Sequence, residues 1–130
     1  MSGRNLFLIC NAHLDPVWLW MWQEGLAETL TTFRTAARLC EEFEEFVFCH
    51  NEALLYQWVE QYEPDLFRRI QMLVASGQWH IMGGWYLQPD CNLPSGESFV
   101  RTGRNGRSGV PPCRSRSPSV TRIASAWCHW

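Results

Sequence analysis

The sequence predicts an α/β protein with a mainly parallel sheet. Short apolar runs typical of buried strands alternate with longer segments in which apolar residues recur every three or four positions, as on the buried face of a helix. The predicted order is strand, helix, strand, two helices, strand, and such an order favours parallel pairing through crossover helices. At 130 residues, the chain is long enough for one domain with a hydrophobic core.

The first strand is expected at residues 6–10, where LFLIC is a continuous apolar run typical of a strand buried on both faces. The first helix is expected over residues 26–43, where charged residues separate apolar residues at helical spacing. Its buried face would carry Leu26, Leu30, Phe33, Ala37, Cys40 and Phe43.

The second strand is expected at residues 46–50, with Asn51 as the N-cap of the helix that follows it. Pro64 suits the first turn of the next helix, and Gly77 suits its C-terminal end. The run WHIMGG, residues 79–84, is then expected to form the third strand.

The charge distribution divides the chain into residues 1–100 and residues 101–130. The first part holds thirteen acidic residues and five arginines, a balance of −8, and the second holds six arginines and no acid, a balance of +6. We interpret residues 101–130 as an aberrant or disordered basic tail, and favour a reading frame lost near Arg101 over a genuine tail. The acidic body argues against a nucleic-acid partner.

The sequence predicts a cytoplasmic protein. Its first residues lack the features of a secretory signal, and LFLIC is too short to span a membrane, so no membrane partner is expected. The six cysteines show no metal-binding spacing, and Cys10 and Cys49 lie in apolar runs. Reduced, buried thiols are therefore expected rather than disulfides. The sequence predicts no particular oligomeric state.

A candidate metal-ligand pair, His13 and Asp15, follows the first predicted strand. In extended backbone, residues i and i+2 point to the same side, so the imidazole and the carboxylate can bind one ion. These ligand types suit zinc, although a catalytic zinc also needs a third protein ligand. Taken alone, the pair is weak evidence, because Asp15 and Pro16 also fit a simple turn.

Aromatic residues follow the ligand pair. Trp18, Trp20 and Trp22 cannot share one face, so at least one is expected in the core, while another could lie against a sugar ring. The segment GGWYLQPD supplies a second aromatic and acidic group, Trp85, Tyr86 and Asp90. Its two glycines fit either a close approach of the backbone to a ligand or an ordinary strand-end turn.

Two further histidines lie in predicted strands. For His50, a hydrogen-bonded core role is favoured over a role in supporting a metal ligand, and His80 is expected to pack within its strand. Functional groups gather at the carboxyl ends of parallel strands. The segments expected to meet there are residues 13–18, 50–52 and 83–90.

Two segments closely resemble the amino-terminal catalytic domain of glycoside hydrolase family 38, the α-mannosidases: NAHLDPVWLW and HNEALLYQWVEQYEPDLFRRIQMLVASGQWHIMGGWYLQPDCNLPSGESFVR. The match runs from about Asn5 to Arg101, in order and with natural spacing. The resemblance implies an α-mannoside substrate and a seven-stranded distorted β/α barrel, of which this chain would hold the front portion.

The resemblance also implies roles for single residues. His13 and Asp15 match two zinc ligands of the family, and Trp18 matches a tryptophan that packs beneath the bound mannose. The implied reaction is a retaining hydrolysis, in which an aspartate attacks the anomeric carbon and a second carboxylate acts as acid and then base. Asp90 is a candidate substrate contact, and Glu97 is either a weaker candidate or part of the first turn of a helix.

The chain departs from the family pattern after Arg101. In the family, the nucleophile lies in an Asp-x-Phe-Gly-His box soon after SGES and also binds zinc, whereas residues 101–130 contain no acid. We therefore expect an incomplete Zn²⁺ site, no nucleophile or acid/base residue, and little or no activity. The alternatives are a non-catalytic carbohydrate-binding fragment that uses Trp18, Trp85 and Tyr86 and, less favoured, an unrelated metal-dependent hydrolase or deacetylase.

Overall fold

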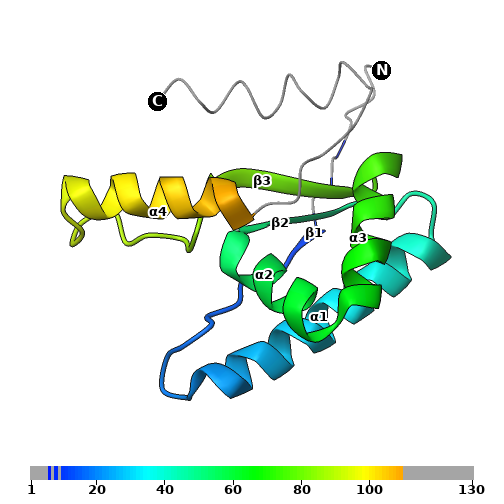
Figure 1. Ribbon diagram of the computed structural model, residues 1–130. Coiled ribbons are helices and arrows are strands. Elements are labelled where there is room, and N and C mark those ends of the chain that lie inside the picture. Colours follow the sequence, from blue (N-terminus) through cyan, green and yellow to red (C-terminus); the bar gives the residue numbers. More distant parts are fainter. Residues whose placement is uncertain (1–5, 7, 9, 110–130) are drawn as a thin grey trace.

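The structure, a computed structural model, describes residues 6, 8 and 10–109 and consists of one parallel sheet and four helices (Figure 1). The elements are β1 (Cys10–Asn11), α1 (Trp22–Glu42), β2 (Phe48–Glu52), α2 (Ala53–Tyr62), α3 (Pro64–Ser76), β3 (Trp79–Trp85) and α4 (Gly96–Gly109). The strand order is β1-β2-β3, with both pairs parallel. Helices α1, α2 and α3 lie together on one side of the sheet in Figure 1. The predicted α/β fold with a parallel sheet is confirmed.

Strand β1 is shorter than the predicted strand at residues 6–10. Pairing with β2 is limited to Cys10–Asn11. Leu6 and Leu8 are 84% and 80% exposed, so the prediction that they are buried on both faces is wrong. The physical reason is that β1 is an edge strand among the described strands, and its beginning is not covered by a helix.

Helix α1 begins at Trp22, before the first helical residue that the periodicity predicted. The Glu24 carboxylate accepts a hydrogen bond from the backbone N–H of Met21 at 2.9 Å, which stabilises this earlier start. Phe43 is 53% exposed and was wrongly placed on the buried face, because it follows the helix in extended backbone. The buried residues of α1 are Gly25, Thr29, Phe33, Ala36, Ala37 and Cys40.

The two following helices differ in how they begin. Strand β2 continues to Glu52, so Asn51 lies in the strand and the prediction that it caps α2 is wrong. Pro64 is at the start of α3, and Gly77 ends that helix with a left-handed φ of 85°, both as predicted. The third strand, β3, confirms the prediction for residues 79–84 and extends it by one position.

The core is built around Phe33 on the sheet-facing side of α1. Its ring packs against those of Phe48, His50, Tyr56 and Trp79, with centroid distances from 5.1 to 6.4 Å. The polar atoms in this cluster are paired: the Trp79 indole N–H donates to the Tyr56 hydroxyl at 2.8 Å, and that hydroxyl donates to the His50 carbonyl at 3.2 Å. Burial raises the pKa of Tyr56, which keeps its hydroxyl protonated as a donor.

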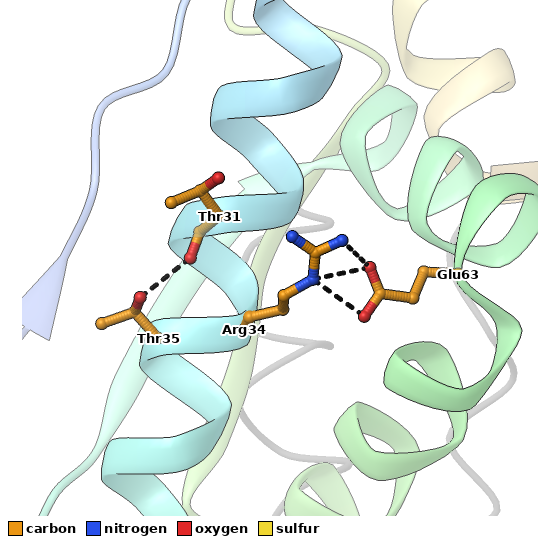
Figure 2. Close-up of polar contacts among 4 residues, drawn as sticks. All are labelled: Thr31, Arg34, Thr35 and Glu63. Atoms are coloured by element: carbon orange, nitrogen blue, oxygen red, sulfur yellow. Dashed lines mark hydrogen bonds and ion pairs between the residues drawn. The ribbon is translucent and has the colours of Figure 1, made fainter.

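Two ion pairs fasten α1 to the α2–α3 unit. Figure 2 shows Arg34 of α1 against Glu63, the residue between α2 and α3, with Nε 3.0 and 2.8 Å from the two carboxylate oxygens. Arg69 of α3 contacts both carboxylate oxygens of Glu41 at 2.9 and 2.7 Å, and this hydrogen-bonded guanidinium lowers the pKa of Glu41. Bidentate contacts of this kind restrain the relative orientation of two helices more strongly than a single N–H···O contact does.

Helix α4 crosses the expected boundary at residue 101. It packs on the end of β3, where the Thr102 carbonyl accepts a hydrogen bond from the Tyr86 N–H at 3.0 Å. Glu97 lies in its first turn and contacts Arg101 at 2.8 Å, which agrees with the helical alternative for Glu97. Residues 101–109 are therefore part of this helix. The remaining residues, 110–130, lie outside the described part, and their interpretation stays a prediction.

The described cysteines are free thiols, and two of them, Cys40 and Cys49, are buried. Burial raises the pKa of both thiols, so both are held in the unreactive protonated form. Cys113 and Cys128 lie outside the described residues. Among residues 6, 8 and 10–109, no helix combines the length and the apolar character that crossing a membrane requires.

Candidate functional site

A cleft of about 330 Å³ opens where the three strands end. Each of the three predicted segments contributes to it, because parallel strands bring their carboxyl ends to one edge of the sheet. The prediction that these segments meet is confirmed. His13 and Leu14 come from the first segment, His50, Asn51 and Glu52 from the second, and Gly83, Trp85 and Gln88 from the third. The strand residues Asn11 and Met82 and the neighbouring Ala12 complete the lining.

His13 and Asp15 converge at the exposed edge of this cleft. The distance from His13 Nε2 to Asp15 Oδ1 is 3.2 Å, and the two side chains are 70% and 44% exposed. Bonds of about 2.0–2.2 Å at a tetrahedral zinc place neighbouring ligand atoms about 3.3–3.6 Å apart. The spacing of the pair is therefore close to that of two neighbouring zinc ligands. Within the described residues, no group of three or more His, Cys, Asp or Glu is arranged to hold a metal.

A close helix contact positions the chain just after this pair. Gly25 in the first turns of α1 lies directly against Pro16, and a Cβ atom at Gly25 would come within 2.1 Å of the Pro16 carbonyl oxygen. The Trp20 indole N–H also donates to the Asp15 carbonyl at 3.3 Å. These contacts fix the backbone that carries Asp15 against the start of α1.

The three tryptophans after the pair are all outside the core, so the prediction that one of them is buried is wrong. Trp18, Trp20 and Trp22 are 69%, 41% and 42% exposed. Trp18 and Trp20 belong to the loop before α1, and Trp22 is the first residue of that helix. The Trp22 ring packs against the rings of Trp58 and Tyr62, with centroid distances of 6.2 and 6.4 Å. Trp18 is not among the residues that line the cleft, and its substrate role stays a prediction.

The candidate residues after β3 separate in the structure. Trp85 lines the cleft. The Tyr86 carbonyl instead accepts a hydrogen bond from Leu54 at 3.1 Å, which ties β3 to α2. Asp90 is exposed and accepts a hydrogen bond from the Asn92 N–H at 2.8 Å, a local turn contact. Of these three candidates, the structure brings Trp85 alone to the cleft, and the substrate roles of the other two stay predictions.

Sequence reasoning did not identify the buried carboxyl group in the cleft, that of Glu52. This residue is 5% exposed, and its Oε1 accepts a hydrogen bond from the Gln88 N–H at 3.2 Å. Its Oε2 is buried and has no hydrogen-bond partner among the described residues. Burial is the main cause that raises the pKa of Glu52; the Gln88 N–H and the charge of His13 act against it, and the charge of Asp15 acts with it.

A bulge in β3 shapes the cleft beside Glu52. His50 pairs with Ile81 and Glu52 pairs with Trp85, so β3 contains extra residues between the two pairs. Gly83 lies in this bulge with a φ of 81°, a conformation that glycine adopts without strain. Gly83 therefore lies in a bulge inside the strand, which differs from the strand-end turn that was one of the two alternatives left open by the sequence.

His50 also lines the cleft, but its ring belongs to the core. Its Nδ1 accepts a hydrogen bond from the Glu52 N–H at 3.4 Å, which requires the proton of the neutral ring to be on Nε2. Burial lowers the pKa of His50 to about 4. The predicted core role of His50 is confirmed. His80 is half-buried in β3, where it pairs with Cys49.

The fold and the cleft define a β/α-type protein with its polar groups at the carboxyl ends of parallel strands. Residues 3–108 match the family model described as the glycosyl hydrolases family 38 N-terminal domain. The chain therefore belongs to glycosyl hydrolase family 38, as the resemblance of its motifs predicted.

Relatives of this chain carry mannosidase names. It is 36% identical over 107 residues to Alpha-mannosidase 2C1 of Homo sapiens, covering 82% of this chain and 10% of that protein. It is 33% identical over 100 residues to Alpha-mannosidase G of Dictyostelium discoideum, covering 77% and 9%. It is 29% identical over 98 residues to Alpha-mannosidase of Saccharomyces cerevisiae, covering 75% and 9%. The chain thus spans about a tenth of the length of these relatives.

Proposed function

We propose that the cleft is part of the sugar-binding site of a zinc-dependent, retaining α-mannosidase. The observation that carries this proposal is the convergence of His13 and Asp15 at the strand ends in a chain of this family. In this proposal, the three parallel strands are the first strands of a seven-stranded distorted β/α barrel, and the partner is an α-mannoside rather than a nucleic acid or a membrane. A cytoplasmic location belongs to the same proposal.

His13 and Asp15 would hold the zinc ion through Nε2 and the carboxylate. When bound, zinc supplies a Lewis acid that orients sugar hydroxyls and stabilises charge. His13 must be neutral to offer its nitrogen lone pair, so binding is expected to weaken in acid. Trp85 offers the cleft an aromatic wall for the apolar C–H face of a sugar. The contact between Gly25 and Pro16 keeps the ligand-bearing backbone in place.

We further propose that this stretch of chain does not hydrolyse mannosides by itself. Retaining hydrolysis needs a nucleophilic carboxylate and an acid/base carboxyl group about 5–5.5 Å apart on either side of the scissile bond. Asp15 is assigned to the metal, the Glu52 carboxyl group is buried and bound to Gln88, and Asp90 is exposed outside the cleft. None of these three is free to attack the anomeric carbon.

The test is hydrolysis of 4-nitrophenyl α-mannoside by the purified chain with added Zn²⁺. We expect no release of nitrophenol above the buffer rate, either from the parent chain or from Asp15→Ala. Turnover by the parent that Asp15→Ala abolishes would contradict the proposed inactivity. Mannoside binding without turnover would match the second candidate function, a carbohydrate-binding unit, which the position of Trp85 in the cleft favours.

A further inference from the structure

Glu52 lines the cleft, and one of its two carboxylate oxygens, Oε2, makes no hydrogen bond among the described residues. The other carboxylate oxygen, Oε1, holds the segment after β3 through the Gln88 N–H at 3.2 Å. Oε2 is buried and has no hydrogen-bond partner among the described residues. Burying a polar atom without a partner is costly, and the great majority of such atoms in folded proteins are paired. The hydrogen bond to Gln88 uses only Oε1, so it does not explain why the second oxygen is buried as well.

The position of Glu52 separates it from the exposed pair at the edge of the cleft. Glu52 is 5% exposed, whereas the His13 and Asp15 side chains are 70% and 44% exposed. His13 and Glu52 both line the cleft. Among the described residues, however, the three do not form a metal-binding group. Glu52 is therefore a lining group at the buried side of the cleft rather than a third ligand.

The other lining residues indicate what Oε2 would meet. Leu14, Met82 and Trp85 offer apolar surface, while Asn51 and the carboxyl group of Glu52 offer polar atoms. A sugar ring has this same mixture, since its C–H faces are apolar and its rim carries O–H donors. A carboxyl oxygen accepts such a donor, and an ionised carboxylate does so about twice as strongly as a neutral acceptor.

We propose that Glu52 Oε2 accepts a hydrogen bond from one hydroxyl of a sugar bound in the cleft, and that Glu52 thereby determines which pattern of hydroxyls the cleft binds. This inference rests on the proposed function of the cleft as an α-mannoside site. It adds a specificity-determining contact that is separate from the metal pair. One bound hydroxyl satisfies the buried oxygen, and a sugar that lacks this hydroxyl leaves it unpaired again.

The test pairs a near-isosteric substitution with a set of sugars that each lack one hydroxyl. Glu52→Gln keeps an oxygen for the Gln88 N–H and replaces the second oxygen with an NH₂ group, which cannot accept a hydrogen bond. Binding of methyl α-mannoside and its 2-, 3-, 4- and 6-deoxy derivatives is measured by calorimetry with the complete 130-residue chain. One deoxy derivative is expected to bind the parent at least tenfold more weakly than methyl α-mannoside does, and Glu52→Gln is expected to reduce that ratio to about twofold.

The control is Glu60→Gln, the same chemical change on the exposed face of α2. Glu60→Gln is expected to preserve the parent's ranking of the five sugars. If the parent binds methyl α-mannoside and Glu52→Gln keeps the same tenfold ratio, the hydroxyl contact is wrong and the proposed function stands. If the folded parent binds none of the five sugars, the proposed function fails, and the inference fails with it.

A measurement on the unmodified chain decides the question if Glu52→Gln does not fold. The ¹³C chemical shift of the Glu52 carboxyl carbon is followed during titration with the same sugars. The shift is expected to move with methyl α-mannoside and with three of the deoxy derivatives, and to stay in place when the one critical hydroxyl is absent. The same movement with all five sugars overturns the contact.

Discussion

At the scale of single residues, the cleft and its edge hold acidic groups in two different environments. Asp15 is partly exposed beside His13. Glu52 is almost fully buried, and burial raises its pKa. Asp15 therefore lies where an exchangeable metal ion can reach it, whereas Glu52 is a fixed group in the wall of the cleft.

A pH-dependent stability is expected from His50. Its pKa is about 4 in the folded chain, against an ordinary value of 6.5. Between pH 6.5 and pH 4, His50 is therefore protonated in the unfolded chain and neutral in the folded chain. The free energy of unfolding should therefore fall as the pH is lowered from 6.5 to 4, by up to about 3 kcal/mol. Glu52 has the opposite effect on stability. Its pKa is raised in the folded chain, so the folded chain binds this proton more readily than the unfolded chain, and acidification favours folding at this residue.

The contribution of His50 is isolated by urea unfolding of the parent and of His50→Asn between pH 4 and pH 7. Asn keeps an oxygen near the position of Nδ1 and cannot titrate. The parent should lose more stability than the variant on acidification. Equal slopes for the two proteins would show that His50 does not couple folding to pH.

The candidate site was predictable where local geometry decides the contact. The spacing of His13 and Asp15 is enough to place both side chains on one side of extended backbone, and they do converge. The role of Glu52 depends on burial by β3 and on a bulge around Gly83, which no pattern near Glu52 encodes. A carboxyl group as the last residue of a buried strand was the signal that could have identified it. Trp18 was expected to contact the substrate; it is not among the residues that line the cleft, and its role stays a prediction.

At the scale of elements, the contact between α1 and the segment after β1 sets the site. Gly25→Ala would bring a Cβ within 2.1 Å of the Pro16 carbonyl oxygen, and this backbone atom has little room to move. The change should destabilise the chain by about 1–3 kcal/mol, which outweighs the gain of up to about 1 kcal/mol in helix propensity. Urea unfolding followed by circular dichroism measures the difference.

The matched control is Gly96→Ala at the start of α4, where an added Cβ meets nothing within 4 Å. Its free energy of unfolding is expected to stay within about 0.5 kcal/mol of the parent's. If Gly25→Ala unfolds at the same urea concentration as Gly96→Ala, the close contact between Gly25 of α1 and the Pro16 carbonyl is contradicted.

Elements with strong local signals were predicted well, and elements that depend on neighbours were not. Pro64 and Gly77 define the ends of α3 through their own backbone preferences. Asn51 is a good N-cap residue by type, yet it stays in β2 because its neighbours His50 and Glu52 both pair with β3. The segment 101–109 lacks an apolar repeat, but contacts with the end of β3 accompany its helical form. Tertiary contacts therefore override the local preference at both places.

At the scale of the whole molecule, the described part has a covered face and exposed apolar groups. The helices α1, α2 and α3 lie on one side of the sheet, and β1 and β3 each pair with β2 alone among the described strands (Figure 1). The loop before α1 exposes Val17, Trp18, Leu19 and Met21, with Leu19 91% exposed. Open strand edges and contiguous exposed apolar side chains both favour association.

Concentration-dependent self-association is therefore expected, and sedimentation velocity measures it. The double change Trp18→Ser and Leu19→Ser should shift the chain toward the monomer, because it removes two large exposed apolar side chains from the loop. Leu93→Ser is the matched control, since Leu93 is 84% exposed but lies between β3 and α4. Equal effects of the two changes, or sedimentation that does not vary with concentration, would contradict a role for the loop.

Shared binding of one divalent cation by His13 and Asp15 is tested most directly by ¹⁵N spectra of the histidine rings during titration with Zn²⁺. The His13 ring nitrogens should shift, and Asp15→Ala should weaken the apparent affinity about tenfold or more, because it removes one of the two ligands. Asp90→Ala, at an acid outside the cleft, should leave the titration unchanged. A His13 signal that does not respond to Zn²⁺, or a titration that Asp15→Ala does not alter, would contradict the metal pair.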